Sequence, residues 1–293
     1  MAFMRTPSGL SNLAKFYGVD FIVFTEGGNT SYSLEDVCNG EFNNSSIDIK
    51  FWESVFIKHK LNKKVEFRAI GSKSSSNEIC KLIEKDEIKN ILVTRDSDLD
   101  DFFGLKYRSP YILYTQGYSF ENDIYHKELI IEQIECLCSS GETLKRIIGM
   151  VDRCYEKFER IAPRLLKIEL IFRSNGINLI TDCCGERFIS ANILPEFKIN
   201  QLVALVKIKK QMLNRPVYLN VGNRELCPVK FTYGKLVESL ATAILTYVCK
   251  KIIGISAIPK DVLKLFLIDK YKNRIGHSED QYYKYQIDSI ITA

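Results

Sequence analysis

Two short apolar segments of this chain are each followed by acidic residues, and this pattern restricts the fold more than any other feature. The first segment is Phe21–Phe24, which precedes Glu26 and Gly27. The second is Ile91–Val93, which precedes Asp96-Ser-Asp98. Short apolar runs of this kind indicate strands that are buried on both faces, as in parallel sheets. Because open α/β folds build their sites at the carboxyl edge of the sheet, the sequence predicts that these carboxylates meet there.

Segments of strand and helix character alternate through the first part of the chain. The expected strands are Phe21–Phe24, Val65–Ile70, Asn90–Thr94 and Pro110–Tyr114, and the expected helices are Ile49–Lys60 and Ser75–Ile88. The second helix is expected to open with a capping box, Ser75-Ser-Asn-Glu78. The polar stretch 28–46 is interpreted as a long loop near the proposed site. Alternating βαβ units predict a mostly parallel sheet with right-handed crossovers.

After residue 127 apolar residues recur at helical spacing. The expected helices are Lys127–Cys138, Glu142–Ile168, Asn200–Leu213, Gly234–Gly254 and Lys260–Tyr271, and the expected short strands are Glu169–Phe172, Ile177–Thr181 and Val217–Val221. The predicted fold is therefore α/β, with a mostly parallel sheet flanked by helices in residues 1–126. A mainly helical region, 127–293, follows it and is expected to serve dimerisation, partner binding or substrate binding.

Composition excludes several classes of protein. A hydrophobic share of 46% in 293 residues excludes wholesale disorder, and no apolar run approaches the roughly 20 residues of a membrane span. The first seven residues lack the apolar stretch of a signal peptide. Nine cysteines at irregular positions do not form a disulfide framework, and the pairs Cys136/Cys138 and Cys183/Cys184 lack zinc-site spacing. We therefore expect a cytoplasmic protein that does not enter a membrane.

Charge is unevenly distributed between the two halves. Residues 1–126 carry 15 Lys and Arg against 18 Asp and Glu, whereas residues 127–293 carry 26 against 18. An acidic half with clustered carboxylates beside a basic half is the arrangement expected for a polyanionic substrate such as nucleic acid. Ordinary solvated helix faces explain the same asymmetry equally well.

The acidic run that begins at Asp96 does not match a calcium loop. An EF-hand starting there would need Gly where the chain has Asp101 and Glu where it has Tyr107. A D-x-D pair at a strand end remains, and an acidic turn that caps a helix is its alternative. Glu121, in the segment Tyr118-Ser-Phe-Glu121-Asn122, follows the last expected strand in the same way. Clustered carboxylates require a cation between them, and hard oxygen ligands favour Mg²⁺ or Mn²⁺.

Taken together, Glu26-Gly27, Gly71, Asp96-Ser-Asp98 and the S-F-E-N segment resemble the Toprim family over residues 18–126. Ile47-Asp48-Ile-Lys-Phe-Trp52 resembles a D-x-x-F-[YW] motif that normally follows E-G closely, so residues 28–46 stand as an insertion. Within the family, the chain is most similar to the Toprim effector nucleases of PARIS anti-phage defence systems. This resemblance implies a metal-dependent nuclease that is held by an ABC-type ATPase. Its release would trigger tRNA cleavage and growth arrest, and we expect a homodimer.

The expected chemistry is phosphodiester cleavage. Asp96 and Asp98 would hold the main ion, and Glu26 would bind a second ion or act as general base. Glu121 would complete the metal shell. Lys73 or Arg95 would contact the scissile phosphate, with an exposed basic residue as the alternative for each. An RNA substrate would also offer its 2′-OH as the nucleophile.

Three other functions stay open. Lys272-Asn273-Arg-Ile-Gly-His277 resembles the R-N-x-x-x-H signature of metal-independent HEPN ribonucleases, with Lys in place of Arg. A DNA nuclease of the overcoming-lysogenisation type is the alternative at the level of substrate. In a non-catalytic binding module, the acidic cluster would only stabilise the fold or dock a partner.

Overall fold

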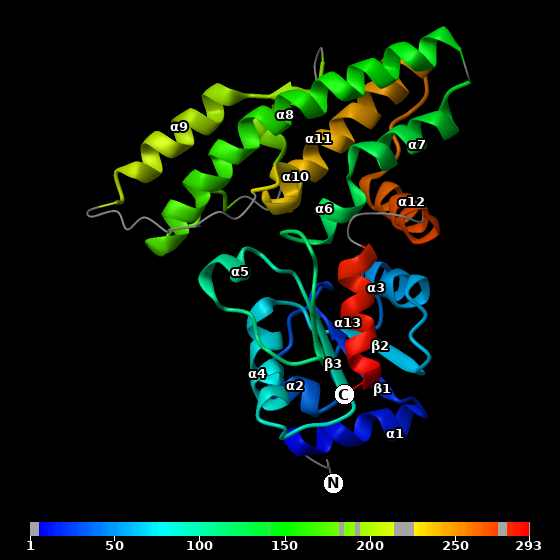
Figure 1. The fold of residues 1–293 in the computed structure, drawn as a ribbon, viewed down its shortest axis with the longest axis vertical. Coiled ribbons are helices and arrows are strands. Elements are labelled where there is room, and N and C mark those ends of the chain that lie inside the picture. The colour runs from blue at the N-terminus through cyan, green and yellow to red at the C-terminus, as the bar shows by residue number, and fades with distance from the viewer. Residues whose placement is uncertain are drawn as a thin grey trace. The chain divides into compact units, whose positions relative to one another are not determined.

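The computed structural model describes residues 6–139, 141–181, 185–190, 194–213, 226–274 and 280–292. The chain divides into two compact units, drawn in Figure 1. The first contains Met1–Gln116 together with Lys264–Ala293, and the second contains Gly117–Leu263. The expected boundary at residue 126 therefore moves to Gln116, and the C-terminal segment returns to the first unit.

The first unit is built on a four-stranded sheet in which every neighbouring pair is parallel. Its strands are β1 (Phe21–Thr25), β2 (Val65–Ala69), β3 (Ile91–Arg95) and β4 (Ile112–Tyr114), in the order β2-β1-β3-β4. This confirms the predicted α/β class and the four predicted strands. It also places the two strands that precede the acidic residues side by side.

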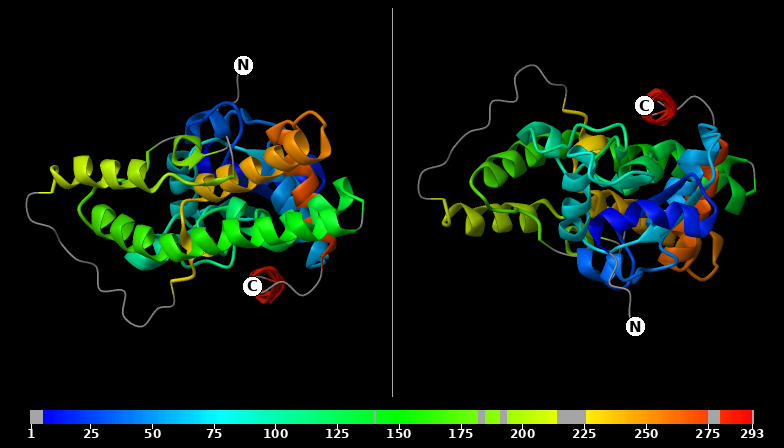
Figure 2. Two further views of the ribbon diagram at one scale, coloured as in Figure 1. Left: turned by 90° about the horizontal axis from the view of Figure 1, so that it is seen from above. Right: turned by 90° about the horizontal axis from the view of Figure 1, so that it is seen from below.

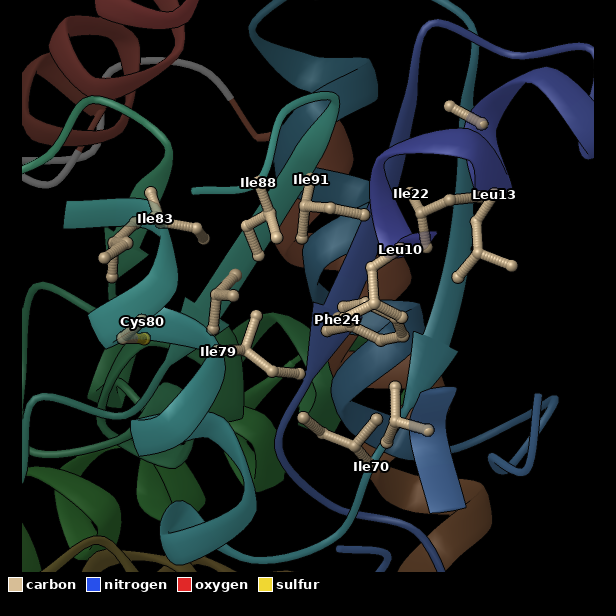
Figure 3. Packing of buried hydrophobic residues seen from close by; sticks show 14 of the residues in the cluster. Leu10, Leu13, Ile22, Phe24, Ile70, Ile79, Cys80, Ile83, Ile88 and Ile91 are labelled. Atoms are coloured by element: carbon tan, nitrogen blue, oxygen red, sulfur yellow. The ribbon is translucent and has the colours of Figure 1, made fainter. Parts of the chain in front are cut away.

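Helices cover both faces of this sheet (Figure 1). On one face lie α1 (Leu13–Tyr17), α2 (Leu34–Cys38) and α4 (Lys73–Glu84), and on the other lie α3 (Ile47–Lys58) and α13 (Asp280–Thr292). Alternate strand residues point to opposite faces, so Ile22 and Phe24 pack with Ile79 of α4 in the cluster shown in Figure 3. Phe67 of β2 meets Phe56 of α3, with ring centroids 5.3 Å apart.

Aromatic packing explains why the C-terminal segment belongs to the first unit. Tyr283 of α13 is fully buried, and its ring lies 6.1 Å from that of Phe51 and 5.8 Å from that of Trp52. An ion pair of 2.6 Å between Lys58 and Asp280 joins the same two helices. Helix α13 had no counterpart among the predicted elements. Its few buried residues pack against α3, and Gln286 and Tyr283 also hydrogen-bond the backbone of Tyr114 and Gln116 at the end of β4.

The stretch 28–46 is more ordered than the predicted loop. It contains α2, whose N-cap residue Ser33 forms a capping box with Asp36. Val37 and Cys38 of this helix are buried in the core. Further along, Asn43 pairs with Ala69 at the end of β2 through two backbone hydrogen bonds of 2.8 and 2.9 Å. The prediction of a plain loop was wrong because two apolar residues are enough to anchor one helical turn.

The start of α4 also differs from the prediction. The helix begins at Lys73 with Ser72 as its N-cap, not at a capping box opened by Ser75. Ser75 and Ser76 already lie within the first helical turns. This earlier start of α4 places Lys73 at the first helical position, next to the carboxyl edge of the sheet.

The second unit is mainly helical, as predicted. Its helices include α6 (Phe120–Ile124), α7 (Lys127–Leu137), α8 (Glu142–Ser174), α9 (Ile199–Lys210), α10 (Pro228–Phe231) and α11 (Gly234–Tyr247). Helix α11 continues into η3 (Val248–Ile253), which has π-helical hydrogen bonding, and α12 (Lys260–Asn273) runs from this unit into the first. Helix α8, with 33 residues, is the long green helix in Figure 2. No helix among the described residues is long and apolar enough to cross a bilayer.

The predicted strands of this region are mostly wrong. Glu169–Phe172 continues α8, because Leu170 and Phe172 extend the buried stripe of that helix. Ile177–Thr181 is described and forms no strand, and Val217–Val221 lies outside the described residues. The strands found are β5 (Ile189–Ser190) and β6 (Glu196–Phe197), which pair antiparallel.

Candidate functional site

The carboxyl ends of β1 and β3 lie together, as expected for adjacent parallel strands. Thr25 at the end of β1 is in register with Thr94 of β3. Glu26 therefore leaves the sheet beside the segment that carries Asp96 and Asp98. Asp96 follows β3 directly and is partly exposed. The predicted convergence of the two strand ends is confirmed.

Glu26 is held by two donors at this edge. Its Oε1 accepts hydrogen bonds from Arg95 Nε and from Ser76 Oγ, each at 3.1 Å. Burial raises the pKa of Glu26; the charge of Arg95 opposes this rise, whereas the charge of Asp98 adds to it. A carboxylate that feels both burial and a neighbouring negative charge favours a bound proton or cation.

Arg95 is the last residue of β3, and its side chain is only 1% exposed. Beyond Glu26, its Nη2 donates to Asn77 Oδ1 at 2.8 Å, and its guanidinium lies over the rings of Tyr107 and Tyr114. The guanidinium is therefore used inside the protein, where it positions Glu26. Contact with a scissile phosphate, which was predicted for Arg95 or Lys73, would require the Arg95 side chain to leave these partners.

Lys73 joins the two acidic residues that follow β3. Its Nζ lies 2.8 Å from Asp98 Oδ2 and 2.8 Å from Asp100 Oδ2. Asp100 is buried and begins the short helix α5 (Asp100–Phe103), so its carboxylate is the better shielded of the two. Two carboxylates thus converge on one cation at the edge of the sheet.

The turn that carries Asp98 has a strained backbone. Asp98 has φ 54° and Leu99 has φ 136°, although neither is glycine. Backbone hydrogen bonds of 2.7 Å from Leu99 and Asp100 to the carbonyl of Ser97 hold this conformation. Ser97 is tied in turn to Thr115, whose Oγ1 accepts from its backbone N–H at 3.0 Å. Strain of this kind persists only where the surroundings support it, and it is common at functional sites.

Two glycines pair with each other at the same edge of the sheet, directly after Glu26. Gly27 and Gly71 exchange backbone hydrogen bonds of 2.7 and 2.9 Å, which joins the segments that follow β1 and β2. Asp48, in the first turn of α3, packs against Gly27: a Cβ built on Gly27 would lie 2.1 Å from Asp48 Oδ2. The insertion 28–46 therefore returns Asp48 to a position beside the E-G pair.

Glu121 belongs to the second unit and has its own partners there. Its carboxylate pairs with Lys235 and accepts from Ser119 Oγ at 2.6 Å. Lys235 also lies 3.1 Å from Glu238, so two buried carboxylates share this half-buried lysine. A shared metal shell of Glu121 with Glu26 stays a prediction.

The fit of a metal ion rests on the donor chemistry. Among the described parts of the chain, no three side chains of His, Cys, Asp or Glu stand as a ready metal-binding group. Asp98 and Asp100 nevertheless share one cation, the Lys73 ammonium, and Glu26 lies within electrostatic reach of Asp98. Oxygen ligands of this kind fit Mg²⁺ or Mn²⁺.

Asp100, Ser76 and Asn77 belong to the site and were not predicted. The sequence could have indicated Asp100, because it continues the alternating acidic run two residues after Asp98. No sequence pattern indicates Ser76 and Asn77. They are ordinary polar helix residues, and they belong to the site because they hydrogen-bond Glu26 and Arg95 at the strand ends. In the HEPN-like motif, Lys272 and Asn273 end α12, and His277 lies outside the described residues.

In sequence comparisons, no protein-family model and no curated protein matches this chain.

Proposed function

We propose that this protein is a metal-dependent endonuclease of the Toprim kind that cleaves RNA, with tRNA as the favoured substrate. The observation that carries the proposal is the pair of 2.8 Å contacts through which Asp98 and Asp100 converge on one cation beside Glu26. This arrangement lies at the carboxyl edge of a parallel sheet, where open α/β folds form their sites.

Asp98 and Asp100, together with Glu26 and Asp96 from the same edge, would hold Mg²⁺ or Mn²⁺. The bound ion would neutralise charge on the phosphate and activate the attacking water or hydroxyl. Arg95 keeps the Glu26 carboxylate in place through its 3.1 Å hydrogen bond. Lys73 contributes a positive charge at the first turn of α4, where the helix dipole also favours a phosphate.

The biological role follows from the resemblance of Glu26-Gly27, Asp96-Ser-Asp98 and the S-F-E-N segment to the PARIS effectors. We propose a cytoplasmic toxic effector of anti-phage defence, acting as a homodimer and restrained by an ABC-type ATPase. The basic surplus of residues 127–293 supports a nucleic-acid substrate.

The direct test uses the purified full-length chain with bulk tRNA and with plasmid DNA. In Mg²⁺ or Mn²⁺ we expect discrete tRNA fragments and intact plasmid, and EDTA should abolish cleavage. Glu26→Gln and Asp98→Asn should each lower the rate by about 100-fold or more, since each removes a charge from the reacting centre.

Asp86→Asn is the matched control. Asp86 has φ 55°, close to the 54° of Asp98, but its side chain is 81% exposed and forms a 3.7 Å ion pair with Lys89. The same chemical change in the same backbone conformation should leave cleavage unaltered. Cleaved plasmid with intact tRNA would replace the assignment with a DNA nuclease, and cleavage that survives EDTA would favour the HEPN-like site.

A non-catalytic binding module is the second candidate. It is favoured by the ion pairs that Lys73 makes with both Asp98 and Asp100, because they give the acidic turn a counter-charge from the protein itself. Growth arrest on expression without a partner separates the two functions. Glu26→Ala should relieve the arrest if the site is catalytic, and it should have no effect on arrest if the acidic cluster only stabilises the fold.

A further inference from the structure

A cavity of about 660 Å³ lies within the second unit. One side is formed by the first turns of α8, and the other side by Leu194, by Tyr247 of α11 and by Ile252 of η3. Pockets for small ligands commonly measure about 300–1,000 Å³. The cavity therefore has the size of a site for a small organic molecule.

The side formed by α8 is basic. Lys145, Arg146 and Arg153 all line the cavity, and among the described lining residues Glu142 is the one that is acidic. Lys145 is paired with Glu142 at 3.5 Å. Within the described parts of the chain, Arg146 and Arg153 have no ion pair or side-chain hydrogen bond. Two guanidinium groups on one face of a helix offer several donors to a multiply charged anion.

Gly149 lies between these two arginines in the sequence of α8. It lies inside a long helix, where glycine costs about 1 kcal/mol relative to alanine, and it lines the cavity between Arg146 and Arg153. A Cβ at this position would point toward Arg153, 3.8 Å from its Nη1. Gly149 therefore lines the cavity with backbone alone, beside the Arg153 guanidinium.

Apart from Thr143, the side chains that complete the described lining are apolar or aromatic. Ile147 and Met150 of α8 are buried, and Tyr247 and Ile252 line the same cavity. Ile252 belongs to the π-helical turn η3, and such turns in the middle or at the end of an α-helix are often found at functional sites. Inorganic anions gain nothing from this surface, whereas a flat ring would be covered by it.

We infer that this cavity binds a nucleoside polyphosphate. Arg146 and Arg153 contact the phosphate chain, and the base lies on the apolar side against Tyr247 and Met150. The ligand is a free nucleotide, because the cavity is of small-molecule size. This site is independent of the proposed nuclease centre, and a nucleotide bound there would regulate the protein or report on the nucleotide pool.

The experiment measures binding of ATP and GTP to the full-length chain by calorimetry, with Mg²⁺ absent. We expect saturable binding of at least one of the two. The double variant Arg146→Gln/Arg153→Gln should weaken it by about 10-fold or more, as expected when two charge-assisted contacts are lost. Tyr247→Ala should weaken binding, and Tyr247→Phe should preserve it.

Arg164→Gln is the matched control. Arg164 is an exposed arginine of the same helix that does not line the cavity. Its substitution makes the same Arg-to-Gln change once, away from the cavity, and should change the affinity by less than about twofold, within the range of a screened surface charge. Circular dichroism and thermal unfolding show whether each variant keeps its fold.

Four outcomes would overturn the inference. These are the absence of binding by either nucleotide, equal loss in Arg164→Gln and the double variant, competition by inorganic tripolyphosphate as effective as by ATP, and tighter binding of a 5′-phosphorylated oligonucleotide than of free nucleotide. Asp98→Asn separates this site from the nuclease proposal. That variant should bind nucleotide normally, whether or not the wild-type chain cleaves RNA.

Discussion

Lys73 Nζ lies 2.8 Å from Asp98 Oδ2 and equally close to Asp100, so the acidic turn after β3 already has a counter-charge. Burial alone would lower the pKa of Lys73, but the charge of Asp98 and the hydrogen bonds to Asp100 and Asp98 raise it above its ordinary value. The lysine therefore keeps its positive charge between the two carboxylates at neutral pH. It occupies the position between the two carboxylates that a divalent ion would take.

Replacing Lys73 with methionine should make stability depend on a divalent ion. Without metal, Asp98 and Asp100 would repel each other, and Lys73→Met should lower the free energy of unfolding by about 1–2 kcal/mol. Added Mg²⁺ or Mn²⁺ should restore most of this loss. Urea unfolding with and without metal measures both effects. Lys81→Met, an exposed change in the same helix, should show neither. A loss in Lys73→Met that metal does not restore would argue against the cation position.

Gly27 should tolerate no side chain. In Gly27→Ala, the alanine would have to adopt a left-handed backbone conformation, with φ 87°, and its Cβ would clash with the carboxylate of Asp48. Gly18→Ala is the matched control, because Gly18 has φ 65° and open space around it. We expect the control to cost about 1 kcal/mol from backbone strain and Gly27→Ala to cost about 2–4 kcal/mol from strain and overpacking together. Chemical denaturation measures both. The double change Gly27→Ala/Asp48→Ala should recover part of the loss, and equal losses for the two glycines would contradict the contact.

Helix α13 should stabilise the first unit through Tyr283. Truncation of this fully buried side chain in Tyr283→Ala should cost about 3–5 kcal/mol. Tyr285→Ala is the matched control, because Tyr285 lies two residues further along the same helix and is 74% exposed. This control should stay within about 0.5 kcal/mol of the wild type. The measurement is the urea midpoint followed by Trp52 fluorescence, because Trp52 contacts Tyr283. Similar midpoints for the two variants would show that α13 does not pack on α3.

Acidification should destabilise the same region through His59. Burial lowers the pKa of His59 below its ordinary 6.5, and the charge of Asp280 only partly opposes this. The ring stacks on Tyr283 at 6.3 Å, and its Nε2 has no hydrogen-bond partner in the described structure. Because the unfolded state takes up the proton more readily, stability is complete above pH 6.5 and falls as the pH drops below it.

His59→Phe should reduce this dependence. The neutral ring keeps the stacking on Tyr283 and cannot take up a proton. Unfolding free energies measured between pH 8 and pH 5 should therefore fall less steeply in the variant than in the wild type. Parallel pH profiles for the two proteins would show that another group causes the loss.

Much of the fold could be predicted because the pattern that indicates each strand or helix lies within a few consecutive residues. The apolar runs before Glu26 and Asp96 indicate buried strands by themselves, and the spacing in α3 and α8 indicates helices. Where local patterns conflicted, packing decided. Glu169–Phe172 has the composition of a strand, but its buried residues continue the stripe of α8. Val37 and Cys38 turned a polar stretch into a helix because the core had room for them.

The sequence by itself determined which residues form strands and which carboxylates follow them, since both are properties of a few consecutive residues. Only the tertiary structure decided the partners of those carboxylates. It brought Asp48 back beside Gly27 across an insertion, gave Asp98 and Asp100 one shared lysine, and buried Arg95 against Glu26. It also placed α13 in the first unit and Glu121 in the second. Such pairings depend on how surfaces distant in the sequence fit together, and no local pattern of residues encodes that fit.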